Sequence, residues 1–93
     1  MKEYIINDIK YKIIKDDDNI FDKSLMDEMY TDYFEPYDYI LGDIAYSHLR
    51  LKGFNNKENP NYKPLNDYAK IDEYIKNKCA YGCKYFILEK VKW

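Results

Sequence analysis

The spacing of apolar residues changes repeatedly along the chain, and these changes constrain the fold more than any other feature. Residues 3–15 alternate apolar and polar side chains, which is typical of strands. Asn7-Asp8 interrupts the alternation and predicts a tight turn between two short strands. Residues 47–54 alternate again, and residues 84–91 form the last predicted strand.

Two segments have helical spacing instead. From Ile20 to just before Pro36, apolar side chains form a stripe opposite acidic ones, which predicts an amphipathic helix that the proline ends. Asp18 or Asn19 is expected to cap its start. A second helix is predicted within residues 66–81, with acids early and lysines late, the order that favours the helix dipole.

The remaining segments complete the predicted order. Residues 37–41 are apolar and aromatic without helical period and predict a buried strand, and Gly42-Asp43 predicts a turn or bulge after it. Residues 55–64 contain four Asn and two Pro and predict a mobile surface loop that contributes little stability. The order β-β-α-β-β-α-β indicates one α+β domain over residues 1–93, with two helices packed on a mostly antiparallel sheet.

Composition excludes several classes of protein. The chain has 93 residues, and its apolar runs are far shorter than the roughly 18 residues that cross a membrane. The N-terminal segment lacks the apolar core of a signal peptide, so we expect a cytoplasmic protein without membrane contact. Charge is segregated although the net charge is only −2: residues 16–43 carry ten acids against one lysine, and residues 44–93 carry ten cations against five acids.

The residues that could support catalysis or metal binding are few. His48 is the only histidine, and neighbouring strand residues point to opposite faces, so a trio of Ser47, His48 and Asp43 is not expected to converge. Cys79 and Cys83 are too few for zinc, which takes about four ligands. We interpret them as buried, reduced thiols, with a reversible disulfide as the alternative. The sequence predicts no catalytic residue, cofactor or metal.

A cationic stripe is the best candidate for a binding surface. His48, Arg50 and Lys52 share one face of the predicted strand at 47–54, and Tyr46 lies close by. Cations beside an aromatic ring suit phosphates, stacked bases or an acidic peptide. We therefore take these four residues as the candidate binding site.

Arg50 stands out because the other 14 cationic side chains are all lysine. Its planar guanidinium suits a site that needs two parallel hydrogen bonds. The partner is either internal, Asp38 or Asp43, or an external ligand. We expect Asp38, Gly42, Asp43 and Gly53 to have structural roles in the turn or in this pair.

Two segments carry a family resemblance. An aromatic-Asp-Tyr strand leads into Gly-Asp within residues 37–43, and Leu-Arg-Leu-Lys-Gly-Phe follows within residues 46–54. A second match is Cys-Ala-Tyr-Gly-Cys and the strand after it, within residues 79–88. In these segments the chain resembles the YutD-like family, small uncharacterised proteins of low-GC Gram-positive bacteria. It departs at Ile44-Ala45, where members often have Trp-Gly. The resemblance implies a bacterial, cytosolic α+β protein and supplies no catalytic residues.

Together these observations predict a small, non-enzymatic binding or regulatory protein that acts through its central hairpin. The expected partner is a protein. The alternative is a nucleic-acid-associated factor that uses the basic residues of 44–93, and a steep salt dependence of binding would distinguish it.

Overall fold

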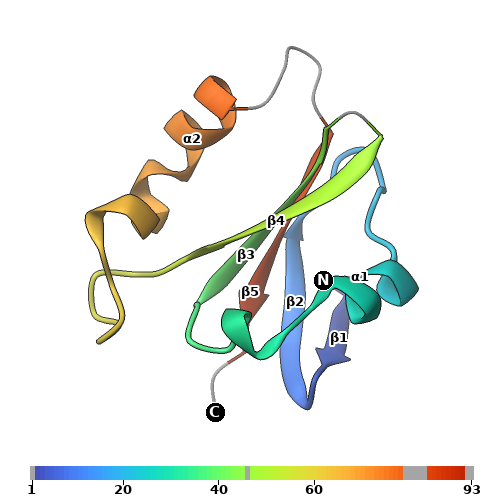
Figure 1. Cartoon of the computed structure of the whole chain (residues 1–93), viewed down its shortest axis with the longest axis horizontal. Coiled ribbons are helices and arrows are strands. Elements are labelled where there is room, and N and C mark those ends of the chain that lie inside the picture. The colour runs from blue at the N-terminus through green and yellow to red at the C-terminus, as the bar shows by residue number, and fades with distance from the viewer. Residues whose placement is uncertain (1, 46, 79–83, 92–93) are drawn as a thin grey trace.

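A five-stranded antiparallel sheet forms the centre of the structure, a computed structural model that describes residues 2–45, 47–78 and 84–91. Its strands are β1 (Glu3–Ile6), β2 (Ile9–Lys15), β3 (Tyr39–Ala45), β4 (His48–Phe54) and β5 (Tyr85–Lys90). They lie in the order β1-β2-β5-β3-β4, so β1 and β4 are the edges of the sheet (Figure 1). Tyr46, Cys79 and Cys83 lie outside the described residues.

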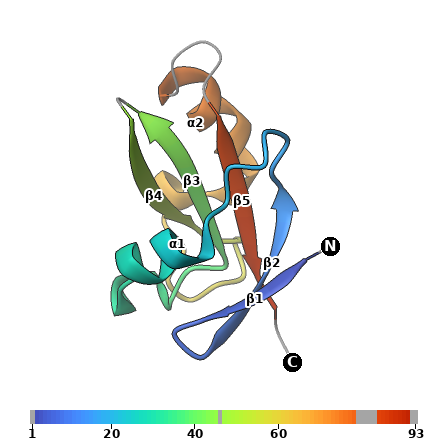
Figure 2. The ribbon, with the colours of Figure 1, turned by 90° about the vertical axis from the view of Figure 1, so that its right-hand side faces the viewer.

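The two helices, α1 (Lys23–Met29) and α2 (Ile71–Lys78), cover opposite faces of the sheet (Figure 2). Each face has its own apolar core. Met26 of α1 packs with Ile40 and Leu88 on one face, and Ile71 of α2 packs with Leu41 and other residues on the second. The predicted α+β class and element order are confirmed. Among the described residues, the helices are too short and too polar to cross a bilayer.

The first hairpin forms where the sequence predicts it. Asn7 and Asp8 have φ values of 53° and 65°, the left-handed conformation that both central residues of a type I′ turn require. Ile6 pairs with Ile9 across this turn. Asn and Asp tolerate positive φ better than most residues, and the turn is correspondingly tight.

Helix α1 is shorter than the predicted helix and begins later. The Asp16 carboxylate accepts the backbone N–H groups of Ile20 (2.9 Å) and Phe21 (3.1 Å), which holds that segment outside the helix. Asp22 is the N-cap, instead of Asp18-Asn19, and accepts from the N–H of Leu25. After α1 the backbone becomes extended, and a short 3₁₀ turn, η1 (Asp32–Phe34), follows.

The predicted turn at Gly42-Asp43 is wrong, because both residues lie inside β3. A Cβ atom on Gly42 would stand 2.2 Å from Cζ of Phe86 in the neighbouring β5. Glycine is therefore needed here for the close approach of a buried ring and not for a turn. The chain reverses only after Ala45, and Ala45 pairs with His48.

The segment 55–64 is held by hydrogen bonds, which corrects the expectation of a loop with little structural role. Asn55 is fully buried, and its Oδ1 accepts from the N–H of Asp38 (2.8 Å) and from Nδ2 of Asn59 (3.0 Å). The chain then enters two 3₁₀ turns, η2 (Pro64–Asn66) and η3 (Tyr68–Lys70), before α2 begins. The carboxylate of Asp67 caps η3 by accepting from the N–H of Ala69 (2.9 Å).

Candidate binding surface

Strand β4 presents its cations on the face that α2 covers. The ammonium of Lys52 lies 5.3 Å from the ring centroid of Phe54 and 5.5 Å from that of Tyr74, so it makes cation–π contacts with both rings. It also lies 3.5 Å from Oδ1 of Asn66. His48 is exposed at the start of the strand. Alternation along β4 therefore places the cations on the face of the sheet that α2 covers.

Arg50 forms a two-pronged pair with Asp43, the residue directly opposite it in the register of β3 and β4. Its Nε lies 3.3 Å from Oδ1 of Asp43, and its Nη2 lies 2.5 Å from Oδ2. The arginine side chain is 49% exposed and the aspartate side chain 6%. The planar fork thus covers a buried carboxylate and still faces solvent on its outer side.

Asp38, the other partner considered for Arg50, contributes to a different network. It is buried, and its Oδ2 accepts from the backbone N–H of Asn56 at 3.0 Å. Its backbone oxygen accepts from the N–H of Lys90 at 2.8 Å. Asp38 therefore helps to attach the segment after β4 to the sheet.

Two adjoining hollows open beside β4 and share Tyr33 and Asn66. The first, of about 440 Å³, lies between η1 and the segment that includes Tyr62 and Lys63. The second hollow, of about 320 Å³, is lined by the Arg50–Asp43 pair and also by Lys52 and Tyr74. We call the β4 surface the set of six lining residues Tyr33, Arg50, Lys52, Lys63, Asn66 and Tyr74, together with His48 at the start of β4, which lines neither hollow.

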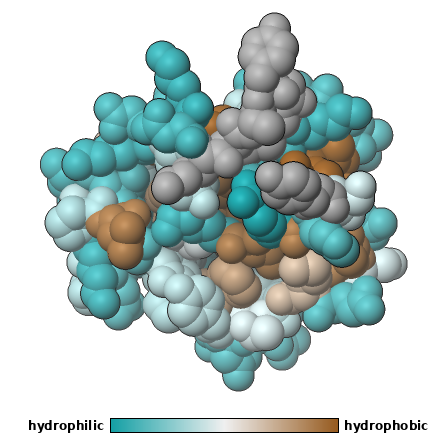
Figure 3. Space-filling model, turned by 45° about the horizontal axis from the view of Figure 1, so that its top comes forward, coloured by the Kyte–Doolittle hydropathy of each residue, from teal (hydrophilic) through white to brown (hydrophobic). Residues whose placement is uncertain are grey.

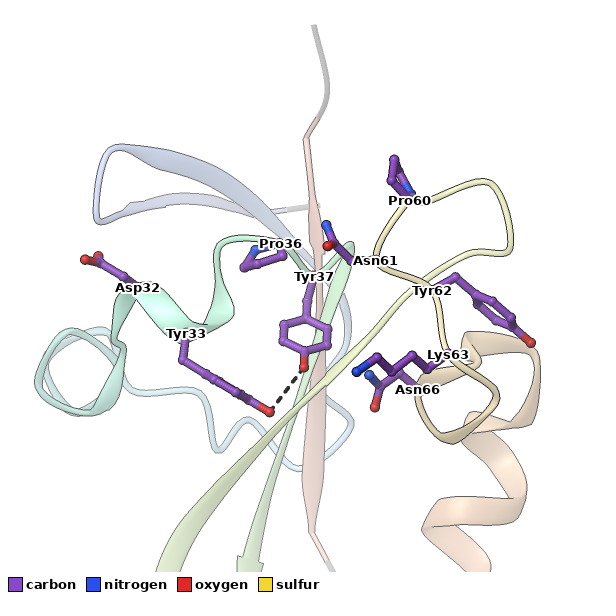
Figure 4. A pocket seen from close by; sticks show the side chains of 9 residues that line it. All are labelled: Asp32, Tyr33, Pro36, Tyr37, Pro60, Asn61, Tyr62, Lys63 and Asn66. Atoms are coloured by element: carbon purple, nitrogen blue, oxygen red, sulfur yellow. Dashed lines mark hydrogen bonds between the residues drawn. The ribbon is translucent and has the colours of Figure 1, made fainter.

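Figure 4 shows how the side chains of the first hollow are arranged. The hydroxyl of Tyr37 donates to that of Tyr33 at 3.1 Å, and Lys63 extends toward these rings from the opposite wall. Asp32 also lines this hollow (Figure 4), and its Oδ1 accepts from Nδ2 of Asn7 at 3.0 Å. The Tyr33 ring is 65% exposed, so an aromatic face stands at the junction of the two hollows.

Buried phenols and a charged neighbour shift the pKa values of the surrounding tyrosines. The hydrogen bond to Tyr33, and then burial, raises the pKa of Tyr37. Burial and the nearby carboxylate of Asp43 raise the pKa of Tyr74. Both phenols therefore stay protonated near neutral pH, and the single O–H of Tyr37 is already donated to Tyr33.

Gly53 has a packing role. A Cβ atom on Gly53 would stand 2.2 Å from Cγ of Tyr37, so this glycine lets the tyrosine ring lie against the strand. Sequence reasoning did not identify Tyr33, Lys63, Asn66 and Tyr74 as neighbours of the cationic stripe. Tyr33 belongs to η1, Lys63 directly precedes η2, Asn66 ends η2, and Tyr74 belongs to α2. No local spacing in the sequence predicts that these elements lie beside β4.

The surface contains groups suited to recognition. Over the described residues, no three His, Cys, Asp or Glu side chains gather where they could hold a metal ion. Hydrophilic side chains cover most of the face shown in Figure 3, and apolar side chains form separate patches between them. The β4 surface thus combines cations, phenol hydroxyls and amides, all of which form hydrogen bonds.

Comparison with known proteins identifies the family. The family described as "Putative antitoxin YutD-like" matches residues 5–89. The chain belongs to the YutD-like family. It is 32% identical over 88 residues to "Putative antitoxin YutD" of Bacillus subtilis strain 168, covering 95% of this chain and 97% of that protein. The resemblance stated from residues 37–54 and 79–88 is thus confirmed.

A solved YutD structure has the same fold. The solution NMR structure of protein yutD from B. subtilis superposes with a TM-score of 0.80 at 30% sequence identity. The match covers 99% of this chain and 84% of that chain. The agreement extends over the five-stranded sheet and both helices, which supports the α+β class as a property of the YutD-like family.

Proposed function

We propose that this YutD-like chain is a small, non-enzymatic binding protein of the antitoxin type, which neutralises a protein partner by binding it through the β4 surface. The matching family and the similar B. subtilis protein both carry the description antitoxin. A protein that neutralises another by occupying it needs a recognition surface and no reaction of its own. This agrees with the sequence-based expectation of a regulatory protein.

One observation carries the assignment to the β4 surface. Three cationic side chains, Arg50, Lys52 and Lys63, line two hollows whose walls include the exposed Tyr33, and His48 lies further along β4, outside both linings. The carboxylate of Asp43 offsets one of these charges. The remaining cations favour a partner with acidic side chains, because complementary charge accelerates association and excludes like-charged competitors.

The charge of the whole chain favours a protein partner over a nucleic acid. The net charge is −2 and the pI about 5.3, whereas nucleic-acid-binding domains are generally basic as a whole. The basic excess of residues 44–93 makes nucleic acid the alternative outcome of the experiment that follows.

The test compares the wild-type chain with two charge-reversal variants. Lys63→Glu changes the wall of the first hollow, and Lys76→Glu is the matched control on the exposed side of α2. Each tagged protein captures binding partners from a lysate of the host bacterium, with and without nuclease. We expect the wild type and the control to capture the same protein after nuclease treatment, and Lys63→Glu to bind it about tenfold more weakly, a change of about 1.4 kcal/mol.

A growth assay then tests neutralisation. The captured protein is produced alone, with the wild-type chain and with Lys63→Glu. We expect growth arrest in the first case, rescue in the second and weaker rescue in the third. Equal capture by all three chains would reject the β4 surface as the binding site. Capture that disappears with nuclease would instead support the nucleic-acid alternative.

A further inference from the structure

The free edge of β4 has backbone groups that alternate in direction. In an antiparallel pair, the N–H and C=O groups of successive residues point to opposite sides of the strand. Asn55, directly after β4, directs its groups away from β3: its N–H donates to the oxygen of Asn66 at 2.7 Å, and its oxygen accepts from the N–H of Tyr68 at 3.0 Å. By alternation, Leu49, Leu51 and Gly53 direct their backbone groups to the same outer edge.

The backbone directions on β3, the other strand of the hairpin, lead to the same assignment for β4. The N–H of Ile44 donates to the oxygen of Lys84, toward β5, at 3.1 Å. Its neighbour Asp43 therefore directs its backbone groups toward β4, where it lies opposite Arg50. Arg50 and Lys52 consequently use their backbone groups to bind β3, which leaves the groups of Leu49, Leu51 and Gly53 at the edge.

The chain itself already adds backbone to part of this edge. Asn55 and Asp67 form a parallel bridge, so the segment 66–68 lies beside the end of β4. Within the described part of the chain, β3 is the only strand that pairs with β4 itself. Gly53, next to this bridge, is buried, whereas Leu49 and Leu51 are only half-buried, so the open part of the edge runs from Leu49 to Leu51.

We propose that the partner adds an extended strand to this edge, along residues 49–51, and that this strand carries acidic side chains at every second position. The inference rests on the proposed function and specifies its mode of binding. Side chains of an added strand lie next to those of β4 on each face. Acidic residues would meet Arg50 and Lys52 on the α2 face.

The residues of β4 on the α1 side of the sheet determine which side chains fit the second face of the added strand. Leu49 and Leu51 are half-buried and pack against the core beneath α1, and Ile44, the neighbour of Leu49 on β3, is 36% exposed. Apolar residues of the added strand would extend this packing. The cations of β4 oppose pairing with a second basic edge and admit an acidic one, which makes the edge selective.

The experiment uses three synthetic nine-residue peptides with the full chain. The first alternates Glu and Val, the second has the same composition with the acids grouped at one end, and the third alternates Lys and Val. Binding is measured by NMR, together with amide hydrogen exchange. We expect the first peptide to bind at least tenfold more tightly than the other two, and to slow exchange at least tenfold at Leu49 and Leu51 but not at Arg50 or Lys52.

A backbone variant provides a second measurement. Leu49→Pro removes one outward N–H group, and Leu49→Ala is its control for the lost side chain, since proline is tolerated at a strand edge whose N–H faces solvent. We expect the proline variant to bind the first peptide at least tenfold more weakly than the alanine variant. If the proline variant does not fold, the exchange measurement on the wild-type chain decides alone.

The outcomes separate this inference from the proposed function. Equal binding of the alternating and grouped acidic peptides, or binding without protection of the amides of Leu49 and Leu51, would overturn strand addition. A partner that binds the wild-type chain and loses affinity for Lys63→Glu could still leave those amides unprotected. In that case the proposed function would stand without strand addition. Protection by the peptide with no neutralised partner would reject the function and retain the edge as a strand-binding site.

Discussion

At the scale of single residues, the Arg50–Asp43 pair combines a half-exposed cation with a buried anion. Pairs exposed on both sides contribute about 0–1 kcal/mol, whereas removing one partner of a fully buried pair costs roughly 3–5 kcal/mol. The contribution of this pair to stability lies between these two values, because solvent screens the guanidinium but reaches little of the carboxylate. The pair therefore stabilises the hairpin, and the guanidinium stays half-exposed.

We expect Arg50→Ala to lower the free energy of unfolding by about 1–2 kcal/mol, because it leaves the Asp43 carboxylate buried without its fork. Arg50→Lys should recover only part of the loss, since an ammonium keeps the charge but cannot make two parallel bonds. Urea unfolding measures both. Lys23→Ala, which removes the exposed pair of Lys23 with Asp27, is the control and should change stability by less than about 0.5 kcal/mol. Wild-type stability of Arg50→Ala would contradict a structural role.

The sequence predicted the common face of the cations on β4, because the direction of a strand side chain follows from local alternation. It did not predict where Asp43 lies. Gly-Asp is a frequent turn sequence, and only the ring of Phe86, more than 40 residues away in the chain, shows why Gly42 is needed inside a strand. Such a close approach is a long-range packing property that a single sequence does not contain.

At the scale of elements, the segment after β4 is attached to the sheet by asparagine side chains. Asn59 donates from Nδ2 to the backbone oxygen of Pro36 at 3.0 Å, as well as to Asn55. The hydroxyl of Tyr62 donates to Oδ2 of Asp67 at 3.0 Å. Composition suggested mobility because Asn and Pro favour turns, but the same polar side chains satisfy buried backbone groups once the segment is folded.

We expect Asn55→Ala to lower the free energy of unfolding by about 1–3 kcal/mol, because the buried N–H of Asp38 loses its acceptor. Asn61→Ala is the matched control, since this asparagine is exposed and the bonds of its backbone remain; it should change stability by less than about 0.5 kcal/mol. Urea unfolding of both variants gives the comparison. Equal stability of the two variants would show that the segment is not anchored through Asn55.

The order of elements was predictable, whereas their exact bounds and juxtapositions were not. Periodicity reports which face of a segment is buried, so the strands and the two helices follow from it. The hollow between η1 and the segment around Lys63 depends on how the segment after β4 turns back over the sheet. That path is set by the buried amide of Asn55, which in the sequence is only one of several asparagines in a polar stretch.

At the scale of the whole molecule, both faces of the sheet are packed with tyrosine, of which the chain has twelve. Tyr11 is fully buried, and its hydroxyl lies 2.8 Å from that of Tyr30, so the two phenols satisfy each other inside the core beneath α1. Burial is the main cause of a raised pKa for most of the affected tyrosines, and the bond to Tyr33 is the main cause for Tyr37. The pKa is raised for Tyr11, Tyr30, Tyr37, Tyr39, Tyr62, Tyr68 and Tyr74.

These shifts predict unfolding in alkali. A tyrosine of the unfolded chain loses its proton near pH 10, whereas a phenol with a raised pKa keeps it in the folded state. The stabilisation is therefore complete below about pH 10 and is lost as the pH rises toward the folded-state pKa. For Tyr11 the loss amounts to about 1.4 kcal/mol per pH unit in that range.

Tyr11→Phe isolates this contribution. The variant removes one shifted group and leaves the Tyr30 hydroxyl without its partner, so we expect it to be about 1 kcal/mol less stable at pH 8. Between pH 10 and 12 its free energy of unfolding should fall less steeply than that of the wild type, by about 1.4 kcal/mol per pH unit. Urea unfolding at a series of pH values measures both slopes. Parallel slopes would show that the Tyr11 phenol ionises as readily in the folded chain as in the unfolded one, and that the paired hydroxyls do not hold its proton.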